Sequence, residues 1–110
     1  MSNSSSTGVT VDIDMATSVS TDSFHISSYS IVAIQFIWSS VTGTINGTLQ
    51  VQGSNNNKDW ANIGSATSVS GASGTALFEI PRTAVKNLRV VYTKIGITGG
   101  ALTIDQFASN

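Results

Sequence analysis

The chain has 110 residues, a length that suits one domain with a single hydrophobic core and leaves little material for a deep, walled active site. Only 10% of its residues are charged, the net charge is −1 and the five basic residues form no dense run, so the composition argues against nucleic-acid binding. There is no cysteine, which excludes disulfides and thiolate metal ligands, and no apolar stretch is long enough to insert across a membrane.

The first quarter of the chain predicts a polar arm followed by a strand. Residues 1–8 are Ser-rich and polar, so we expect a flexible N-terminal arm. Apolar and polar residues then alternate strictly over 9–15, which is the period of a half-buried strand. A polar loop over 17–21 and a short strand over 23–26 follow.

The most apolar segment of the chain covers residues 29–38 (YSIVAIQFIW). It shows little alternation, so we predict a central strand covered on both faces. The polar residues 39–43 are expected to form a turn that ends this strand. Alternation resumes over 48–52, and Leu49 and Val51 mark the buried face of the strand predicted there.

The second half of the chain consists of short apolar runs separated by turn residues. Strands are predicted over 60–63, 75–80, 88–93 and 101–107, and turns over 53–59 and 96–100. The Ser/Gly-rich stretch 64–74 predicts a long loop or a weak edge strand. Pro81 ends the strand before it, because proline cannot donate to a sheet ladder.

These segments amount to about seven to nine short strands at regular spacing, with little or no helix. We therefore expect an all-β protein, an antiparallel β-sandwich of jelly-roll type, formed as a single domain over residues 9–110.

The sequence offers few residues for catalysis. His25 is the only histidine and no Gly-x-Ser-x-Gly elbow is present, so a Ser–His–acid triad is not predicted. Asp12 and Asp14 leave the same face of their strand and could hold calcium with residues near Asp22, but a solvated strand face is the preferred interpretation. We expect a protein that is not an enzyme and that has no cofactor and no metal.

One turn combines an aromatic ring with amides, a combination suited to sugar recognition. The candidate ligand-binding residues are Asn55, Asn56, Asn57, Asp59 and Trp60. The alternative is that Trp60 packs inward beside Leu49 and Val51, because buried aromatic rings dominate small cores. We favour inward packing, for which Trp60→Ala would cost about 3–5 kcal/mol.

Several short motifs follow one another along most of the chain, and their order and spacing carry the comparison that follows. They are Ile34–Trp38 (IQFIW), Gly47–Leu49 (GTL), Ser54–Asn55, Trp60, Arg89–Thr93 (RVVYT) and Gly99–Leu102 (GGAL). Together they resemble a family of small structural proteins of tailed bacteriophages with a discoidin-like β-sandwich. The chain departs from the discoidin pattern at Asn56-Asn57, where Asp-Gly is common, and it lacks the discoidin disulfide. The resemblance implies the sandwich fold and assigns no binding residue.

The resemblance also implies a role in the virion as a decoration, head-fibre or tail-associated protein. Such a protein would act through self-assembly or lattice binding, so its partners would be further copies of itself, in a homo-oligomer, or other virion proteins. Residues 1–7 lack the basic start and apolar run of a signal peptide, so we expect synthesis in the host cytoplasm. The alternative function is a carbohydrate- or cell-surface-binding module that binds a surface glycan through an exposed Trp60 and the Asn-rich turn.

Overall fold

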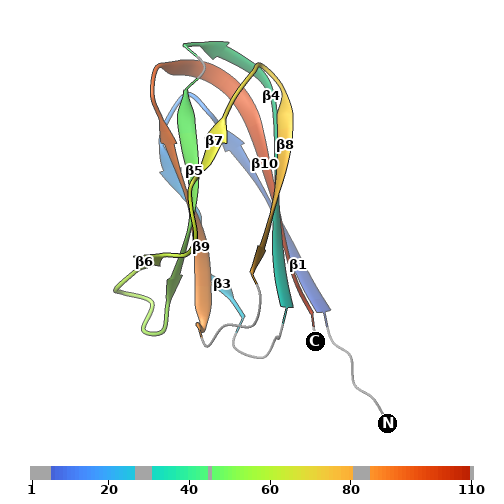
Figure 1. Cartoon of the computed structure of the whole chain (residues 1–110), viewed down its shortest axis with the longest axis vertical. Helices are drawn as coiled ribbons and strands as arrows, with labels where there is room; N and C mark the ends of the chain where they lie inside the picture. Colours follow the sequence, from blue (N-terminus) through green and yellow to red (C-terminus); the bar gives the residue numbers. More distant parts are fainter. Residues whose placement is uncertain (1–5, 27–30, 45, 81–84, 110) are drawn as a thin grey trace.

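Two antiparallel β-sheets pack face to face in the computed structural model, which describes residues 6–26, 31–44, 46–80 and 85–109 (Figure 1). The four-stranded sheet has the order β1-β10-β4-β8, with β1 (Ser6–Asp14), β4 (Ile31–Gly43), β8 (Gly74–Ile80) and β10 (Ile97–Ser109). The six-stranded sheet contains β2 (Val19–Ser20), β3 (Phe24–His25), β5 (Gly47–Ser54), β6 (Ala61–Asn62), β7 (Thr67–Val69) and β9 (Asn87–Lys94). Within the described ranges, no helix is long and apolar enough to cross a membrane.

The strand order is that of a jelly roll. β2 and β3 both pair with β9, while β6 and β7 both pair with β5, so each of these couples occupies one position in its sheet. The sandwich then has two layers of four positions, and the chain changes layer at every connection except the one after β5. A jelly roll is a double sheet of eight such strands. The predicted antiparallel sandwich is confirmed, and the two split strands explain why there are ten strands in place of about seven to nine.

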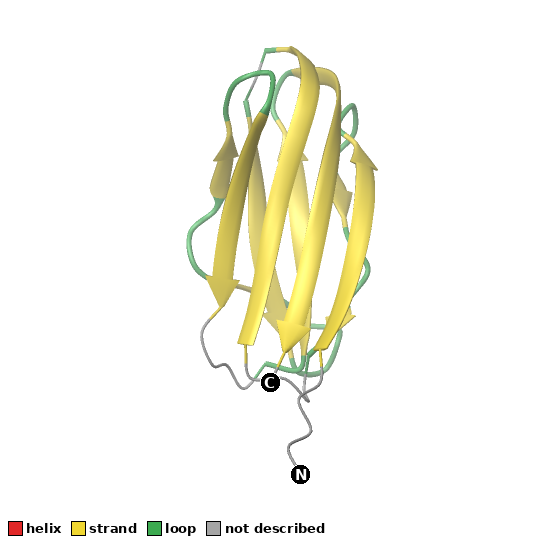
Figure 2. Cartoon of the chain, turned by 90° about the vertical axis from the view of Figure 1, so that its right-hand side faces the viewer, coloured by secondary structure: helices red, strands yellow, loops and turns green. Residues whose placement is uncertain are grey.

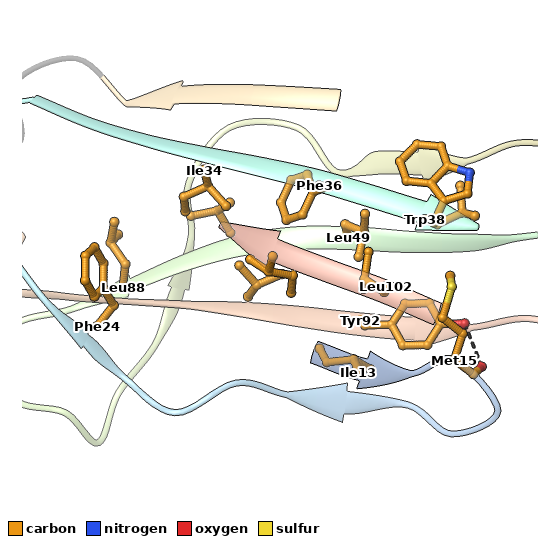
Figure 3. Packing of buried hydrophobic residues seen from close by; sticks show 14 of the residues in the cluster. Ile13, Met15, Phe24, Ile34, Phe36, Trp38, Leu49, Leu88, Tyr92 and Leu102 are labelled. Carbon is orange, nitrogen blue, oxygen red and sulfur yellow. Dashed lines mark hydrogen bonds between the residues drawn. The ribbon is translucent and has the colours of Figure 1, made fainter. Parts of the chain in front are cut away.

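The core lies between the sheets because each long strand turns every second side chain inward. Ile34 and Phe36 of β4 and Leu88 and Tyr92 of β9 line this core from the two sheets, and all four side chains are fully buried (Figure 3). Burial of each large apolar side chain contributes about 1.5–3 kcal/mol. The alternating strands therefore supply one continuous core from both sheets.

Tyr92 ties the two sheets together at one end of this core. Its hydroxyl donates a hydrogen bond of 2.9 Å to the backbone oxygen of Met15, which directly follows β1 (Figure 3). Burial, with a smaller contribution from the charge of Asp14, raises the pKa of Tyr92 above its usual value of 10.0. The neutral phenol is therefore the form that the fold stabilises.

The prediction that the apolar strand over 29–38 is covered on both faces is wrong for its described part. Ile34, Phe36 and Trp38 are buried, whereas Gln35 is exposed and Ile37 is 39% exposed. Tyr29 and Ser30 lie outside the described residues. The outer side of the four-stranded sheet is not packed against the other sheet, so the apolar run overstates the burial of this strand (Figure 2).

Two predicted turns are parts of long strands. β4 continues through residues 39–43, and β10 starts at Ile97 and includes Gly99 and Gly100. The register between these strands shifts twice, between Ile97 and Gly99 and between Gly99 and Ala101. Ser40 (φ 56°) and Gly100 (φ 140°) supply left-handed backbone at these irregularities. The turn-forming residues therefore build bulges within the pair and do not end it.

Most strand boundaries elsewhere follow the predictions closely, but β2 lies within residues 17–21, where a polar loop was predicted, because Val19 and Ser20 pair with β9. β1 begins at Ser6, three residues before the predicted start, and its first residue pairs with Ser109. β7 lies within the Ser/Gly-rich stretch 64–74, where a weak edge strand is one of the predictions. Residues 1–5 of the predicted arm lie outside the described residues.

Candidate functional site

The Asn-rich turn after β5 is held by its own side chains. The Ser54 hydroxyl accepts hydrogen bonds from the backbone N–H groups of Asn56 (3.3 Å) and Asn57 (2.9 Å). The side-chain oxygen of Asn56 accepts from the N–H groups of Lys58 and Asp59, each at 2.9 Å. Asn57 adopts left-handed backbone with φ 60°, which asparagine tolerates better than most residues. The local sequence therefore specifies the shape of this turn.

Other polar atoms of the predicted ligand-binding residues also form hydrogen bonds within the protein. The Asn56 side-chain amide donates to Asp59 at 2.9 Å, and the Asn55 side-chain oxygen accepts from the backbone N–H of Lys86 at 2.9 Å. The second bond attaches the turn to the segment that precedes β9. Asn55, Asn56 and Asp59 thus build the turn itself, and the side chain of Asn57 is exposed.

Trp60 is not in the core, so the expectation of inward packing is wrong. The ring is half-buried and is absent from the core cluster and from the apolar residues packed against it. The guanidinium of Arg89 lies over it, 4.4 Å from the ring centroid. Arg89 points outward because its neighbours Leu88 and Val90 are buried. Trp60 therefore lies on the outer face of the six-stranded sheet.

The pairing register explains this position. Gly53 of β5 faces inward and pairs with Ala61, so Trp60 lies level with Ser54, the next residue of β5. Successive residues of a strand point to opposite faces, so the position of Trp60 points outward. The inward space beside Gly53 is occupied by other side chains. A Cβ placed on Gly53 would lie 2.6 Å from Ile63 and 2.7 Å from Val85. Ile63 and Val85 thus cover the core at the point where Trp60 was expected.

A row of polar side chains crosses the same outer face. Arg89, Gln52 and Asn62 stand opposite one another on β9, β5 and β6. The Arg89 Nε donates to the Gln52 side-chain oxygen at 2.8 Å, and the Gln52 amide donates to the Asn62 side-chain oxygen at 3.0 Å. Sequence reasoning did not select these three residues, although the alternation of Gln52 with Val51 indicates that Gln52 faces outward. With Trp60, the row forms a platform of one ring, one guanidinium and two amides, which can contact a protein surface or a sugar.

The acidic residues considered for calcium are engaged by neutral donors. Asp12 accepts from the Thr103 hydroxyl at 3.1 Å, and Asp14 accepts from the backbone N–H of Ala16 at 3.0 Å. Asp22 is exposed in the loop between β2 and β3. In the part of the chain that the structure describes, no three His, Cys, Asp or Glu side chains gather in a way that could hold a metal ion.

The single histidine lies at the edge of the six-stranded sheet. His25 is exposed on β3, and its Nδ1 is 3.1 Å from the side-chain oxygen of Asn87 on β9. The structure therefore places His25 on a strand surface beside an amide.

The comparisons with known proteins concern the fold. The chain matches no known protein family and no curated protein sequence. Its structure is similar to the SPBc2 prophage-derived protein YomS, with a TM-score of 0.69 and 10% identity over 100% of this chain and 97% of that one. It is also similar to the PBSX exported protein XepA, with a TM-score of 0.56 and 14% identity over 94% of this chain and 36% of that one. The chain therefore shares a β-sandwich fold with these two proteins.

Proposed function

We propose that this chain is a non-enzymatic structural component of a tailed-phage virion that acts by self-association or by binding to a lattice of virion proteins. The observation that supports this proposal best is the likeness to YomS, a prophage-derived protein, which extends over essentially the whole of both chains. The sequence motifs from Ile34 to Leu102 favour the same class of protein independently of the structure.

The surface of the sandwich is consistent with assembly. Leu77 on β8 is 60% exposed and Phe107 on β10 is 51% exposed, and both belong to the sheet whose described residues include no lysine or arginine. β8 is also an edge strand, and Glu79 is its only charged residue. Edge strands without lysine or other charges are poorly protected against pairing with another chain. Burial of these apolar side chains and of the β8 edge against neighbouring proteins in a particle would stabilise the assembly.

The test is the location of the chain in phage particles produced from the genome that encodes it. Particles purified on a density gradient and washed with salt should contain the chain in many copies, as measured by quantitative mass spectrometry. The abundant cytoplasmic chaperones in the same lysate serve as the control for contamination. A chain that is abundant in the lysate and absent from washed particles would refute the proposal.

Glycan binding is a second candidate function, because Trp60 lies on the outer face beside Gln52 and Asn62. Binding of the chain to a glycan array should then be lost in Trp60→Ala. Asn57→Gly serves as the matched control, because glycine accepts the left-handed backbone of Asn57 without altering the ring. Absence of binding by the unmodified chain would remove this candidate.

A further inference from the structure

The outer side of the four-stranded sheet, the sheet that faces the viewer in Figure 2, carries a concentration of negative charge. Its outward side chains, which we call the acidic face, are represented by Asp12, Asp105, Glu79, Ile37, Leu77 and Phe107. Asp14 extends the same row of β1, so four of the six carboxylates of the chain belong to this sheet. The described residues of its four strands include no lysine or arginine.

Apolar side chains interrupt the carboxylates on this face. Phe107 stands opposite Ala33, and Leu77 stands opposite Gln35, which places Leu77 diagonally beside Ile37. Diagonal neighbours on a sheet are close enough for large side chains to touch. Exposure of 39% at Ile37, 60% at Leu77 and 51% at Phe107 leaves apolar surface that water contacts in the free chain. The acidic face therefore combines negative charge with exposed apolar surface that a partner can bury.

The lysine and arginine residues that the structure describes lie on the six-stranded sheet and the turns that adjoin it. Arg89 points outward from β9, and Lys58 lies in the Asn-rich turn. Lys86 and Lys94 are exposed at the two ends of β9, in step with the inward residues Leu88 and Tyr92, and are not part of the outer face. Of the carboxylates outside the acidic face, Asp59 directly follows Lys58 and Asp22 lies in the loop between β2 and β3, while Arg82 lies outside the described residues. We call the outward platform of Arg89, Trp60, Gln52 and Asn62, with Lys58 beside it, the basic face. The outer sides of the two sheets, which bear these faces, are turned away from each other (Figure 1).

We propose that copies of this chain stack head to tail, with the acidic face of one copy against the basic face of the next. This inference rests on the proposed function and names the surfaces and the partner for its self-association. Each copy has one face of each sign on opposite sides, so the contact can repeat from copy to copy. A heterologous contact of this kind produces a ring if the rotation closes and an open filament if it does not.

Charge decides between this contact and the symmetric alternative. A two-fold contact between two acidic faces would place like charges opposite one another, which destabilises an interface. Against the basic face, Asp105 and Glu79 meet a surface that holds Arg89 and Lys58, while the indole of Trp60 offers apolar area to Leu77 or Phe107. Tryptophan and arginine are the residue types most enriched among those that dominate binding energy.

The test uses one blocked variant for each face and measures association by sedimentation velocity. Leu77→Lys blocks the acidic face, and Lys58→Glu blocks the basic face without removing the Arg89–Trp60 contact. Thr17→Lys, in the exposed loop between β1 and β2, is the matched control for an added lysine outside both faces. Circular dichroism establishes that each variant is folded.

We expect the unmodified chain to form species larger than a dimer, and each blocked variant to associate at least roughly tenfold more weakly. An equimolar mixture of the two blocked variants should form a dimer and stop, because each retains the face that the other lacks. Association should also weaken between about 50 mM and about 500 mM NaCl, because salt screens opposite charges.

Three outcomes would overturn the head-to-tail contact. Loss of association in Leu77→Lys alone, with association of the unmodified chain strengthened by salt, would identify a two-fold contact between acidic faces. Unchanged association in both variants would place the contact elsewhere on the molecule. A strictly monomeric chain would refute stacking, and the presence of that chain in washed phage particles would still support the proposed virion role.

Discussion

Arg89 lies over Trp60 on the outer face of the six-stranded sheet, with its guanidinium carbon 4.4 Å from the centroid of the ring. The contact joins β9 to the residue that leads into β6. A cation–π contact at a partly exposed site contributes about 0.5–1 kcal/mol. Together with the hydrogen bond from Lys86 to Asn55, it holds the Asn-rich turn against the sheet from the outside.

Trp60→Ala should therefore lower the free energy of unfolding by only about 1 kcal/mol, since the loss is one exposed contact and part of one ring. Trp38, which is 4% exposed in the core, is the matched comparison, and Trp38→Ala should cost about 3–5 kcal/mol. Urea denaturation of both variants measures the difference. Equal losses would mean that Trp60 is a core residue after all.

Stability should fall at alkaline pH because of Tyr92. Its pKa in the folded chain is raised above 10.0 by burial and by Asp14, so the folded state keeps this proton when the unfolded state has released it. The contribution is complete below pH 10 and is lost as the pH rises further. In Tyr92→Phe, the alkaline fall in melting temperature should be smaller, while loss of the bond to Met15 lowers stability by about 1 kcal/mol at neutral pH. Parallel alkaline profiles for the two proteins would contradict this assignment.

Gln106→Met should stabilise the fold by about 1 kcal/mol. Gln106 is 2% exposed on the inward side of β10, and its side-chain oxygen is buried without a hydrogen-bond partner among the described residues. Methionine keeps a similar shape and removes this unsatisfied group. Gln35→Met, at an exposed outward position of β4, is the control and should change the unfolding free energy little. A clear loss of stability in Gln106→Met would indicate that the amide has a partner, such as a buried water molecule.

Gly74→Ala should destabilise the sandwich by about 1–3 kcal/mol. A Cβ at Gly74 would lie 2.5 Å from Cζ2 of Trp38, so the indole ring or β8 must move. At Gly8 on β1, the nearest atom to a Cβ is in Phe107 at 3.5 Å, an ordinary contact, and Gly8→Ala should change stability by less than about 0.5 kcal/mol. Thermal unfolding of both variants provides the comparison. A melting temperature for Gly74→Ala equal to that of the unmodified chain would show that Trp38 is not fixed as described.

Strand positions were predictable because alternation is a property of neighbouring residues. The residues over 48–52 and 88–93 alternate between apolar and polar or weakly apolar types, and the structure places β5 and β9 there. The turn over 53–59 was equally accessible, because Asn56 and Asn57 make the local contacts and backbone shape that such turns need. Both features depend on interactions within a few residues.

The errors occur where pairing between distant strands decides the outcome. Residues 39–43 and 96–100 have turn composition, yet the two segments lie side by side and absorb their irregular residues as bulges. Trp60 follows the strand of Leu49 and Val51, but the pairing of Gly53 with Ala61 sends the ring to the opposite face. A shift of one residue in either register would reverse these placements.

The sequence by itself determined an all-β sandwich and the inward side of most of its strands, because the period of two is visible within those strands alone. Only the tertiary structure decided which strands lie side by side, and therefore which outward-pointing residues of different strands lie on the same face. Thr10 and Asp105 are joined by a 2.8 Å hydrogen bond, although nearly the whole chain separates them in sequence. That pairing of β1 with β10 brings Asp12, Asp14 and Asp105 onto one sheet, and the separation of charge between the two faces results from the strand order. Strand order depends on contacts between residues far apart in the chain, and no local pattern encodes them.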